Sequence, residues 1–396
     1  MGTESRRESE GSDYKNVFAL GFVSFFTDIS TEMVLSLLPN FIVNLPGSNE
    51  AILGLIEGFA EAVSYGLRAF SGVFSDRFRR RKAIVLLGYT ISNIVKPLFY
   101  IVQTASEAFA IRVADRVGKA VRTAPRDALI SESISEKHRG TAFGLHRTLD
   151  QAGAIIGPLI ALGCILFLGL SQRDVFLLSF LPGIVAVLIL LIGVKERVAA
   201  STRKLSLLRD IGTAVKGNFL FLLIIVAIFS LGSFNYSFVL IYAEESGIPI
   251  YMVPLFYTII NIAHTIIAIP IGVLSDRIGK EKALLIGYGA FLSAAGLMAA
   301  GPHFLFSPIL VSAAFGLYAG IVETVQRAMV PEYVDRELIG TAYGVYYLVV
   351  GIAMLFANTI FGSLWLQFGS RSAALYSISF ALFAMIGIMI FMLRKK

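Results

Sequence analysis

The sequence predicts an all-α integral membrane protein with twelve transmembrane helices in two pseudo-symmetric six-helix bundles, and three observations lead to this prediction. First, 56% of the 396 residues are hydrophobic, the mean hydropathy is +0.76 and only 15% are charged, against roughly 25% in soluble domains. Second, apolar runs of about 20 residues recur, which matches spanning helices rather than the alternating segments of a β-barrel. Third, two motifs repeat at a fixed offset along the chain.

The apolar runs define the predicted elements in order. Residues 1–14 form a polar cytoplasmic tail, and residues 195–217 form a cytoplasmic linker between the bundles at 15–194 and 218–396. At a rise of about 1.5 Å per residue, each run is long enough for a hydrocarbon core of about 30 Å. The predicted spans cover residues 16–44, 51–74, 83–103, 107–129, 140–170, 174–194, 218–243, 251–274, 283–301, 304–329, 341–368 and 373–393.

The basic residues predict the orientation of the chain. Most of the 34 Lys and Arg residues lie in the tails and in alternate loops, whereas the remaining loops hold only Arg173 and Arg371. By the positive-inside rule, both termini are cytoplasmic. The net charge of +7 therefore needs no nucleic-acid partner, because the basic loops lack interleaved aromatic residues for base stacking. The linker suits either a helix on the inner leaflet or a solvated connection.

The internal repeat aligns residues 72–77 with 272–277 and residues 140–144 with 340–344. Such a period indicates a duplicated unit, and parallel repeats of six spans place a substrate site between the halves near the midplane. The segment Gly-Val-Phe-Ser-Asp-Arg-Phe-Arg-Arg-Arg-Lys beginning at Gly72 resembles the loop motif Gly-x-Leu-x-Asp-Arg-x-Gly-Arg-Arg/Lys of the major facilitator superfamily, with Arg79 in place of a glycine. The resemblance covers residues 15–394 and implies a transporter that works by alternating access.

Two further segments refine the resemblance. Gly153-Ala-Ile-Ile-Gly157-Pro158 in the fifth predicted span resembles the Gly-x-x-x-Gly-Pro signature of the proton-coupled antiporter branch, which implies export. The same two glycines also suit close helix packing in any membrane protein, so both interpretations stay open. The stretch from Asp115 to Asp127 resembles a bacterial subgroup that exports drugs, metabolites or siderophores, which implies a bacterial inner membrane.

Charged residues inside the predicted spans mark the candidate site, because a charge at the bilayer centre costs roughly 2.5–3.5 kcal/mol on insertion scales. Paired carboxylates in a low-dielectric cavity repel each other, which favours protonation of one of them. The candidate proton-coupling residues are Asp28, Glu32, Glu57 and Glu61. Structural ion pairing of these acids with Arg68 or Arg112 is the alternative.

The candidate substrate-binding residues share helical faces that should line a central water-filled cavity. They are Arg68, Arg112, Asp115, Arg116, His146, Arg147, Asp150, Asn235, Tyr257, Asn261, Glu323 and Arg327. Candidate gating residues lie at cytoplasmic ends of spans, where the arginines of the fourth span are expected to pair with the loop motif. They are Asp76, Arg77, Arg122, Arg126, Asp127, Asp276 and Arg277. We expect His264 to be a hydrogen-bonded core histidine rather than a proton relay.

These patterns predict a proton-coupled secondary transporter that exports a small polar, zwitterionic or carboxylate-bearing molecule, such as a metabolite, siderophore or drug. The sequence has no phosphate loop and no catalytic or metal-ligand spacing, so we expect no enzyme activity, cofactor or metal, and a proton gradient as the energy source. We expect a monomer in contact with substrate, protons and bilayer lipid. The alternatives are a proton-independent uniporter or importer of an organic anion, and a lipid translocase or receptor on the same scaffold.

Overall fold

The computed structural model describes residues 2–78, 81–135, 138–196, 212–301, 306–335 and 338–394, and within them it describes all side chains except those of residues 2–13 and 69–78. Every regular element in these ranges is helical, which confirms the all-α prediction. Nine helical segments of this described part are long and apolar enough to cross a membrane.

Within the described residues, each of the twelve predicted spans contains helix. The segment α15 (Ile339–Arg394) contains the last two of them, because Gly369, with a φ of 79°, interrupts its helical geometry. The nine apolar segments therefore account for ten of the predicted spans. Helices α3 (Glu50–Phe78) and α5 (Ala105–Ser133), which hold many of the charged residues, account for the other two.

The chain forms two compact units, which we call unit 1 and unit 2. Unit 1 comprises Met1–Ser36, Phe70–Val102 and Ser106–Leu205, and unit 2 comprises Leu37–Ala69, Gln103–Ala105 and Ser206–Lys396. Residues 37–69 thus group with the second half of the sequence. The division into bundles at 15–194 and 218–396 stays a prediction, and most of the predicted linker, residues 197–211, lies outside the described residues.

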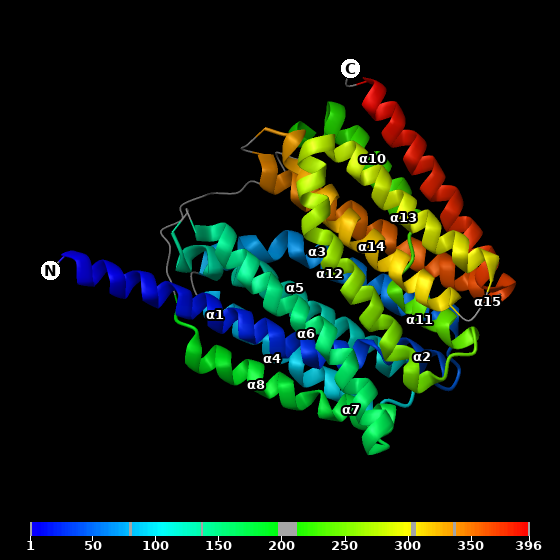
Figure 1. Ribbon diagram of the computed structural model, residues 1–396, viewed down its shortest axis with the longest axis horizontal. Coiled ribbons are helices and arrows are strands. Elements are labelled where there is room, and N and C mark those ends of the chain that lie inside the picture. The colour runs from blue at the N-terminus through cyan, green and yellow to red at the C-terminus, as the bar shows by residue number, and fades with distance from the viewer. Residues whose placement is uncertain are drawn as a thin grey trace. The chain divides into compact units, whose positions relative to one another are not determined.

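Unit 1 is a bundle in which α1 packs along α6 and α8 (Figure 1). Its core is formed by apolar side chains from five helices, among them Leu20, Val23, Leu129 and Leu190. Its elements are α1 (Gly2–Leu35), α4 (Arg81–Val95), the 3-10 helix η1 (Lys96–Tyr100), α5, α6 (Arg139–Leu168), α7 (Gln172–Leu178) and α8 (Phe180–Gly193).

The contact between α1 and α6 depends on two glycines. A Cβ atom at Gly153 would lie 2.3 Å from the carbonyl oxygen of Phe25, and one at Gly157 would lie 2.8 Å from that of Ile29. Side chains do not approach backbone atoms so closely, so glycine is what lets the two helices touch. The helix-packing interpretation of this motif therefore holds in the structure, and its antiporter interpretation stays a prediction.

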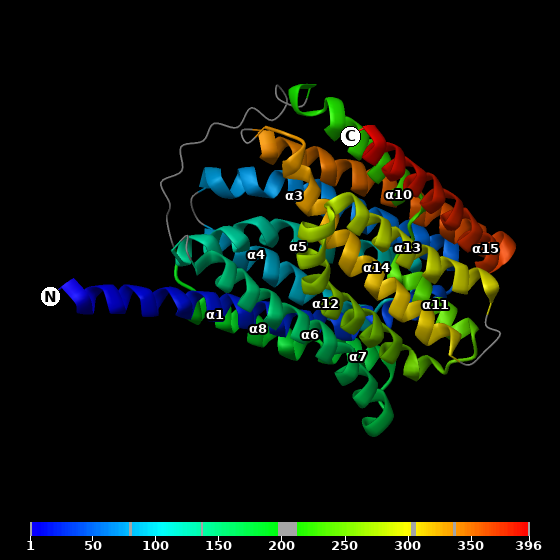
Figure 2. The same cartoon turned by 45° about the horizontal axis from the view of Figure 1, so that its top comes forward.

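Unit 2 contains the helices α13, α14 and α15, which lie side by side in both views (Figures 1 and 2). The first part of α3 packs against α15, where a Cβ atom at Gly54 would lie 2.2 Å from the carbonyl oxygen of Asn358. The other elements are α2 (Leu38–Val43), α10 (Gly217–Gly232), α11 (Tyr236–Glu245), η3 (Ile250–Met252), α12 (Val253–Ile278), α13 (Lys280–Ala300), α14 (Ser307–Met329) and η4 (Val330–Glu332).

One predicted span of unit 2 is a broken helix, since α10 ends at Gly232 and α11 begins at Tyr236. Two side chains of α15 satisfy backbone groups beside the break. The Tyr376 hydroxyl donates to the Leu231 carbonyl (2.7 Å), and the Asn235 N–H donates to Asn358 Oδ1 (2.8 Å). Such partners let irregular backbone persist at membrane depth, usually where it borders a cavity.

Candidate functional site

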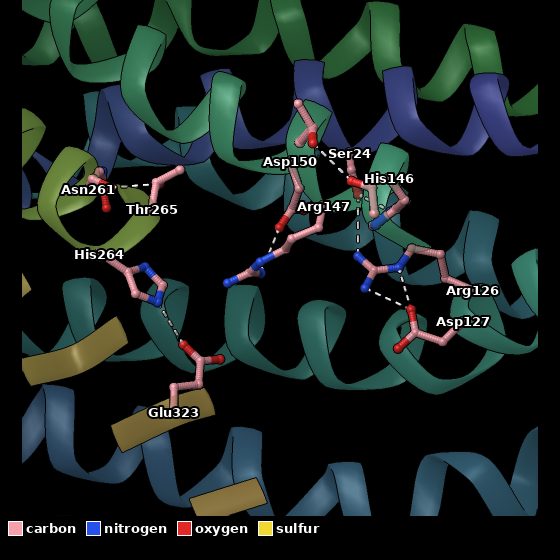
Figure 3. A network of polar contacts seen from close by, with 12 residues as sticks. Ser24, Arg126, Asp127, His146, Arg147, Asp150, Asn261, His264, Thr265 and Glu323 are labelled. Carbon is pink, nitrogen blue, oxygen red and sulfur yellow. Dashed lines mark hydrogen bonds and ion pairs between the residues drawn. The ribbon is translucent and has the colours of Figure 1, made fainter. Parts of the chain in front are cut away.

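In unit 1, two carboxyl groups from different helices meet. Asp28 of α1 and Asp150 of α6 lie within electrostatic and hydrogen-bonding range of each other. Cations surround the pair, since Arg147 Nη1 lies 3.0 Å from Asp150 Oδ2 and Lys119 of α5 lies within electrostatic range of Asp28. Figure 3 shows the contact between Arg147 and Asp150. A hydrogen bond between two carboxyl groups requires a proton on one of them, so this pair is suited to hold a single proton.

A second polar cluster of unit 1 is centred on Arg126 of α5. Its Nε donates to Asp127 Oδ1 (2.9 Å) and its Nη1 donates to Ser24 Oγ (3.3 Å) (Figure 3). Ser24 also lies 3.0 Å from His146 Nε2 and 3.1 Å from the Tyr89 hydroxyl. The predicted substrate ligand His146 is therefore a buried member of a network that links α1, α4, α5 and α6.

Deeper in unit 1, Arg112 and Asp115 are fully or almost fully buried, and Arg112 Nη1 lies 3.5 Å from Asp115 Oδ2. Lys96 is also buried, and its Nζ donates to Thr31 Oγ1 (2.7 Å) and Asn93 Oδ1 (3.0 Å). The predicted role of Arg112 and Asp115 in substrate binding stays a prediction, because both side chains are packed inside the unit.

The four predicted proton-coupling carboxylates fall into different units. Asp28 and Glu32 belong to unit 1, where Glu32 is buried, as is the predicted substrate ligand Arg116. Glu57 and Glu61 belong to unit 2, where Glu57 is fully buried and Glu61 lines a cavity.

The predicted gate lies partly outside the described side chains, because those of Asp76 and Arg77 are not among them. The predicted pairing of α5 arginines with that loop thus stays a prediction. Within unit 1, Arg126 contacts Asp127 and Ser24, and the Arg122 guanidinium lies 4.4 Å from the centre of the Tyr89 ring. The last turn of α12 exposes Asp276 and Arg277.

Unit 2 contains a cavity of about 240 Å³. We call it the unit 2 cavity. Its charged and amide lining residues are Glu61, Arg68, Asn235, Glu323, Gln326 and Arg327. Its aromatic lining residues are Tyr65, Phe229, Phe234, Tyr236, Phe315, Tyr318, Tyr346 and Tyr347. Five predicted site residues, one assigned to proton coupling and four to substrate binding, therefore meet in one cavity, and residues of the helix break border it.

At one side of this cavity, Glu323 of α14 contacts an arginine and a histidine. Its Oε1 lies 2.7 Å from Arg327 Nη2, one turn along the same helix, and its Oε2 lies 3.2 Å from His264 Nε2 of α12. Figure 3 shows the imidazole of His264 pointing toward the carboxylate. The side chains of Glu323 and Arg327 are 37% and 38% exposed, so both remain accessible from the cavity.

The other predicted ligands of unit 2 lie on the same helices but make different contacts. Tyr257 is buried, with its ring centre 4.7 Å from that of Tyr236. The backbone carbonyl of Asn261 accepts a hydrogen bond from Thr265 Oγ1 (2.7 Å). Neither Tyr257 nor Asn261 is among the residues that line the cavity.

Sequence reasoning missed Tyr65 as a site residue. Glu61, Arg68, Glu323 and Arg327 all act electrostatically on its hydroxyl, so it lies amid the cavity charges. The spacing of Glu61, Tyr65 and Arg68 places the three on one helical face, and this signal was present in the sequence.

Comparison with known proteins agrees with this architecture. The family model of the Major Facilitator Superfamily matches residues 20–358 and 220–396. An MFS-type transporter of Methanocaldococcus jannaschii is 36% identical over 371 residues, which cover 91% of each chain. The multidrug resistance protein MdtG of Serratia proteamaculans is 26% identical over 284 residues, or 68% of each chain. A crystal structure of a mutant nucleoside transporter NupG has a TM-score of 0.81 at 15% identity, covering 96% of this chain and 100% of that one.

Proposed function

We propose that this chain, which belongs to the Major Facilitator Superfamily, is a proton-coupled secondary transporter that exports a small polar, zwitterionic or carboxylate-bearing molecule. It works as a monomer with both termini in the cytoplasm of a bacterial cell, and the proton gradient supplies its energy. The distribution of basic residues between alternate loops supports this orientation. The 26% identity to a protein named for multidrug resistance supports export.

The observation that carries the proposal is the carboxyl pair Asp28–Asp150 in unit 1. With one proton the pair is hydrogen-bonded and carries a single negative charge. When that proton leaves, two negative charges face each other and depend on Arg147 and Lys119 for compensation. The two protonation states therefore favour different arrangements of α1, α5 and α6, and a proton can shift an equilibrium between states for which its affinity differs.

The variant Asp28→Asn tests the role of this pair. The amide can still donate a hydrogen bond to Asp150, but it cannot release a proton. We expect substrate-driven proton movement to fall at least about tenfold, whereas exchange of labelled for unlabelled substrate across the membrane persists. Proton movement is measured in reconstituted vesicles with a pH-sensitive dye, after a stability screen against metabolites, siderophores and drugs has identified a ligand.

The matched control is Asp335→Asn, which removes an exposed carboxylate in the loop that follows the tenth predicted span. It should leave proton movement unchanged. Gradient-independent transport by the unaltered protein would overturn the proposal in favour of a uniporter.

A further inference from the structure

The charges that line the unit 2 cavity balance, because Glu61 and Glu323 are matched by Arg68 and Arg327. All four act on one hydroxyl, that of Tyr65, so they form one electrostatic environment. A cargo with a net charge would leave one excess charge in this low-dielectric region, which is strongly unfavourable. A cargo that carries one charge of each sign keeps the balance.

The ion pair Glu323–Arg327 is a geometric template for such a cargo. Its two charged groups are 2.7 Å apart, and both side chains remain more than a third exposed. An ammonium group of the cargo can form an ion pair with the carboxylate of Glu323, and a carboxylate of the cargo can form one with the guanidinium of Arg327. Two ion pairs with the cargo then replace the one internal ion pair. His264 Nε2, 3.2 Å from the other oxygen of Glu323, holds that carboxylate in place during the exchange.

Aromatic rings make up much of the remaining wall. Tyr65 and Tyr347 have ring centres 5.9 Å apart, and Tyr346 meets Tyr347 edge to face at 5.4 Å. Phenylalanine rings, including Phe234 and Phe315, supply purely apolar surface to the same cavity. Aromatic faces pack well against another flat ring and do not require that ring to carry a polar group.

We propose that the unit 2 cavity binds an aromatic zwitterion, with its ammonium group at Glu323, its carboxylate at Arg327 and its ring against the tyrosine wall, by which we mean Tyr65, Tyr346 and Tyr347. The inference rests on the proposed transport function and specifies its substrate class. The balanced set of two acids and two arginines inside an aromatic lining is the observation that carries it.

Direct binding to the purified full-length protein in lipid nanodiscs tests the proposal without any gradient. The probes are matched series on indole and phenyl scaffolds. They comprise the zwitterions tryptophan and phenylalanine, the amines tryptamine and phenethylamine, the acids indole-3-propionate and 3-phenylpropionate, and the uncharged 3-ethylindole and ethylbenzene. We expect at least one zwitterion to bind about 10- to 100-fold more tightly than its own amine and acid, since each lost contact to a charged partner weakens binding by about that factor.

Two variants assign the ends of the ligand. Glu323→Gln should erase the advantage of the zwitterion over the acid, and Arg327→Gln should erase its advantage over the amine. The controls Glu107→Gln and Arg371→Gln, at positions outside the cavity lining, should preserve both ratios. Because the readout is a ratio within one variant, a partly unfolded preparation does not imitate the result.

The outcomes separate this inference from the proposed function. Equal or tighter binding of the amine or the acid, or no binding of any zwitterion, overturns the inference, even where Asp28→Asn abolishes proton coupling with another substrate. Conversely, selective zwitterion binding together with gradient-independent transport supports the inference and overturns the proposed function.

Discussion

Gln326 connects three helices of unit 2 through its side-chain amide. Its Oε1 accepts a hydrogen bond from the Tyr346 hydroxyl of α15 (2.8 Å), and its Nε2 donates to the Tyr288 hydroxyl of α13 (3.1 Å). All three side chains are buried. One amide thus satisfies two tyrosine hydroxyls at the edge of the unit 2 cavity, and the position of the tyrosine wall depends on it.

Replacing Gln326 by leucine should destabilise the protein by about 1–3 kcal/mol, because it leaves buried hydroxyls without partners. The double variant Gln326→Leu/Tyr346→Phe should recover part of the loss, since the hydroxyl of Tyr346 is removed with its partner. Unfolding in mixed detergent micelles measures both effects. The exposed Gln367→Leu is the control, and an equal loss there would show that the hydrogen bonds are not responsible.

The residues of the site were predictable where they share a helix. The helical spacing of Glu61 and Arg68 along one span predicted that they share a face, and both line the cavity. The partner of Asp28 was not predictable in the same way. Spacing suggests Glu32, four residues on, whereas the partner within hydrogen-bonding range is Asp150 on another helix. Periodicity reports neighbours along one helix, and contacts between helices depend on tertiary packing.

At the scale of helices, hydropathy predicted all twelve spans but not the break between α10 and α11. Hydropathy averages over Gly232, Ser233 and Asn235 at the break, because apolar residues flank them on both sides, and it therefore predicts one continuous span. The break is stable because Asn358 and Tyr376, more than a hundred residues later, satisfy its backbone groups. The residues Gly232, Ser233 and Asn235 are a local signal for a turn and a helix start, whereas the two partners on α15 lie outside any local window.

The packing of α1 on α6 gives a prediction at this scale. Gly153→Ala should destabilise unit 1 by about 1–3 kcal/mol, because its methyl group would lie 2.3 Å from the Phe25 carbonyl oxygen and force the helices apart. The melting temperature of the purified protein reports the change.

Gly163 in the same helix is the matched control. A Cβ atom there would meet only the Phe167 ring, at 3.8 Å. Gly163→Ala should therefore stabilise the helix by up to about 1 kcal/mol, the difference in helix propensity between the residues. A melting temperature that falls equally in both variants would contradict the close-contact explanation.

At the scale of the whole molecule, the charged residues that lie mostly in the first half of the sequence are divided between the two compact units. Unit 2 takes Glu57, Glu61 and Arg68 from that half, because residues 37–69 group with the second half. There Glu61 and Arg68 join Glu323 and Arg327 around one cavity. The carboxyl pair Asp28–Asp150 stays in unit 1, so the candidate proton site and the candidate cargo site belong to different units. Coupling between them then requires a change that both units share.

The orientation of the chain can be tested with single cysteines. The chain has one natural cysteine, Cys164, so Cys164→Ser provides a cysteine-free background. We expect a membrane-impermeant maleimide to label Arg371→Cys in intact cells and Lys282→Cys only after permeabilisation, because loops rich in basic residues remain in the cytoplasm. The reverse pattern would contradict the predicted topology, because it would place the loops rich in basic residues outside the cell.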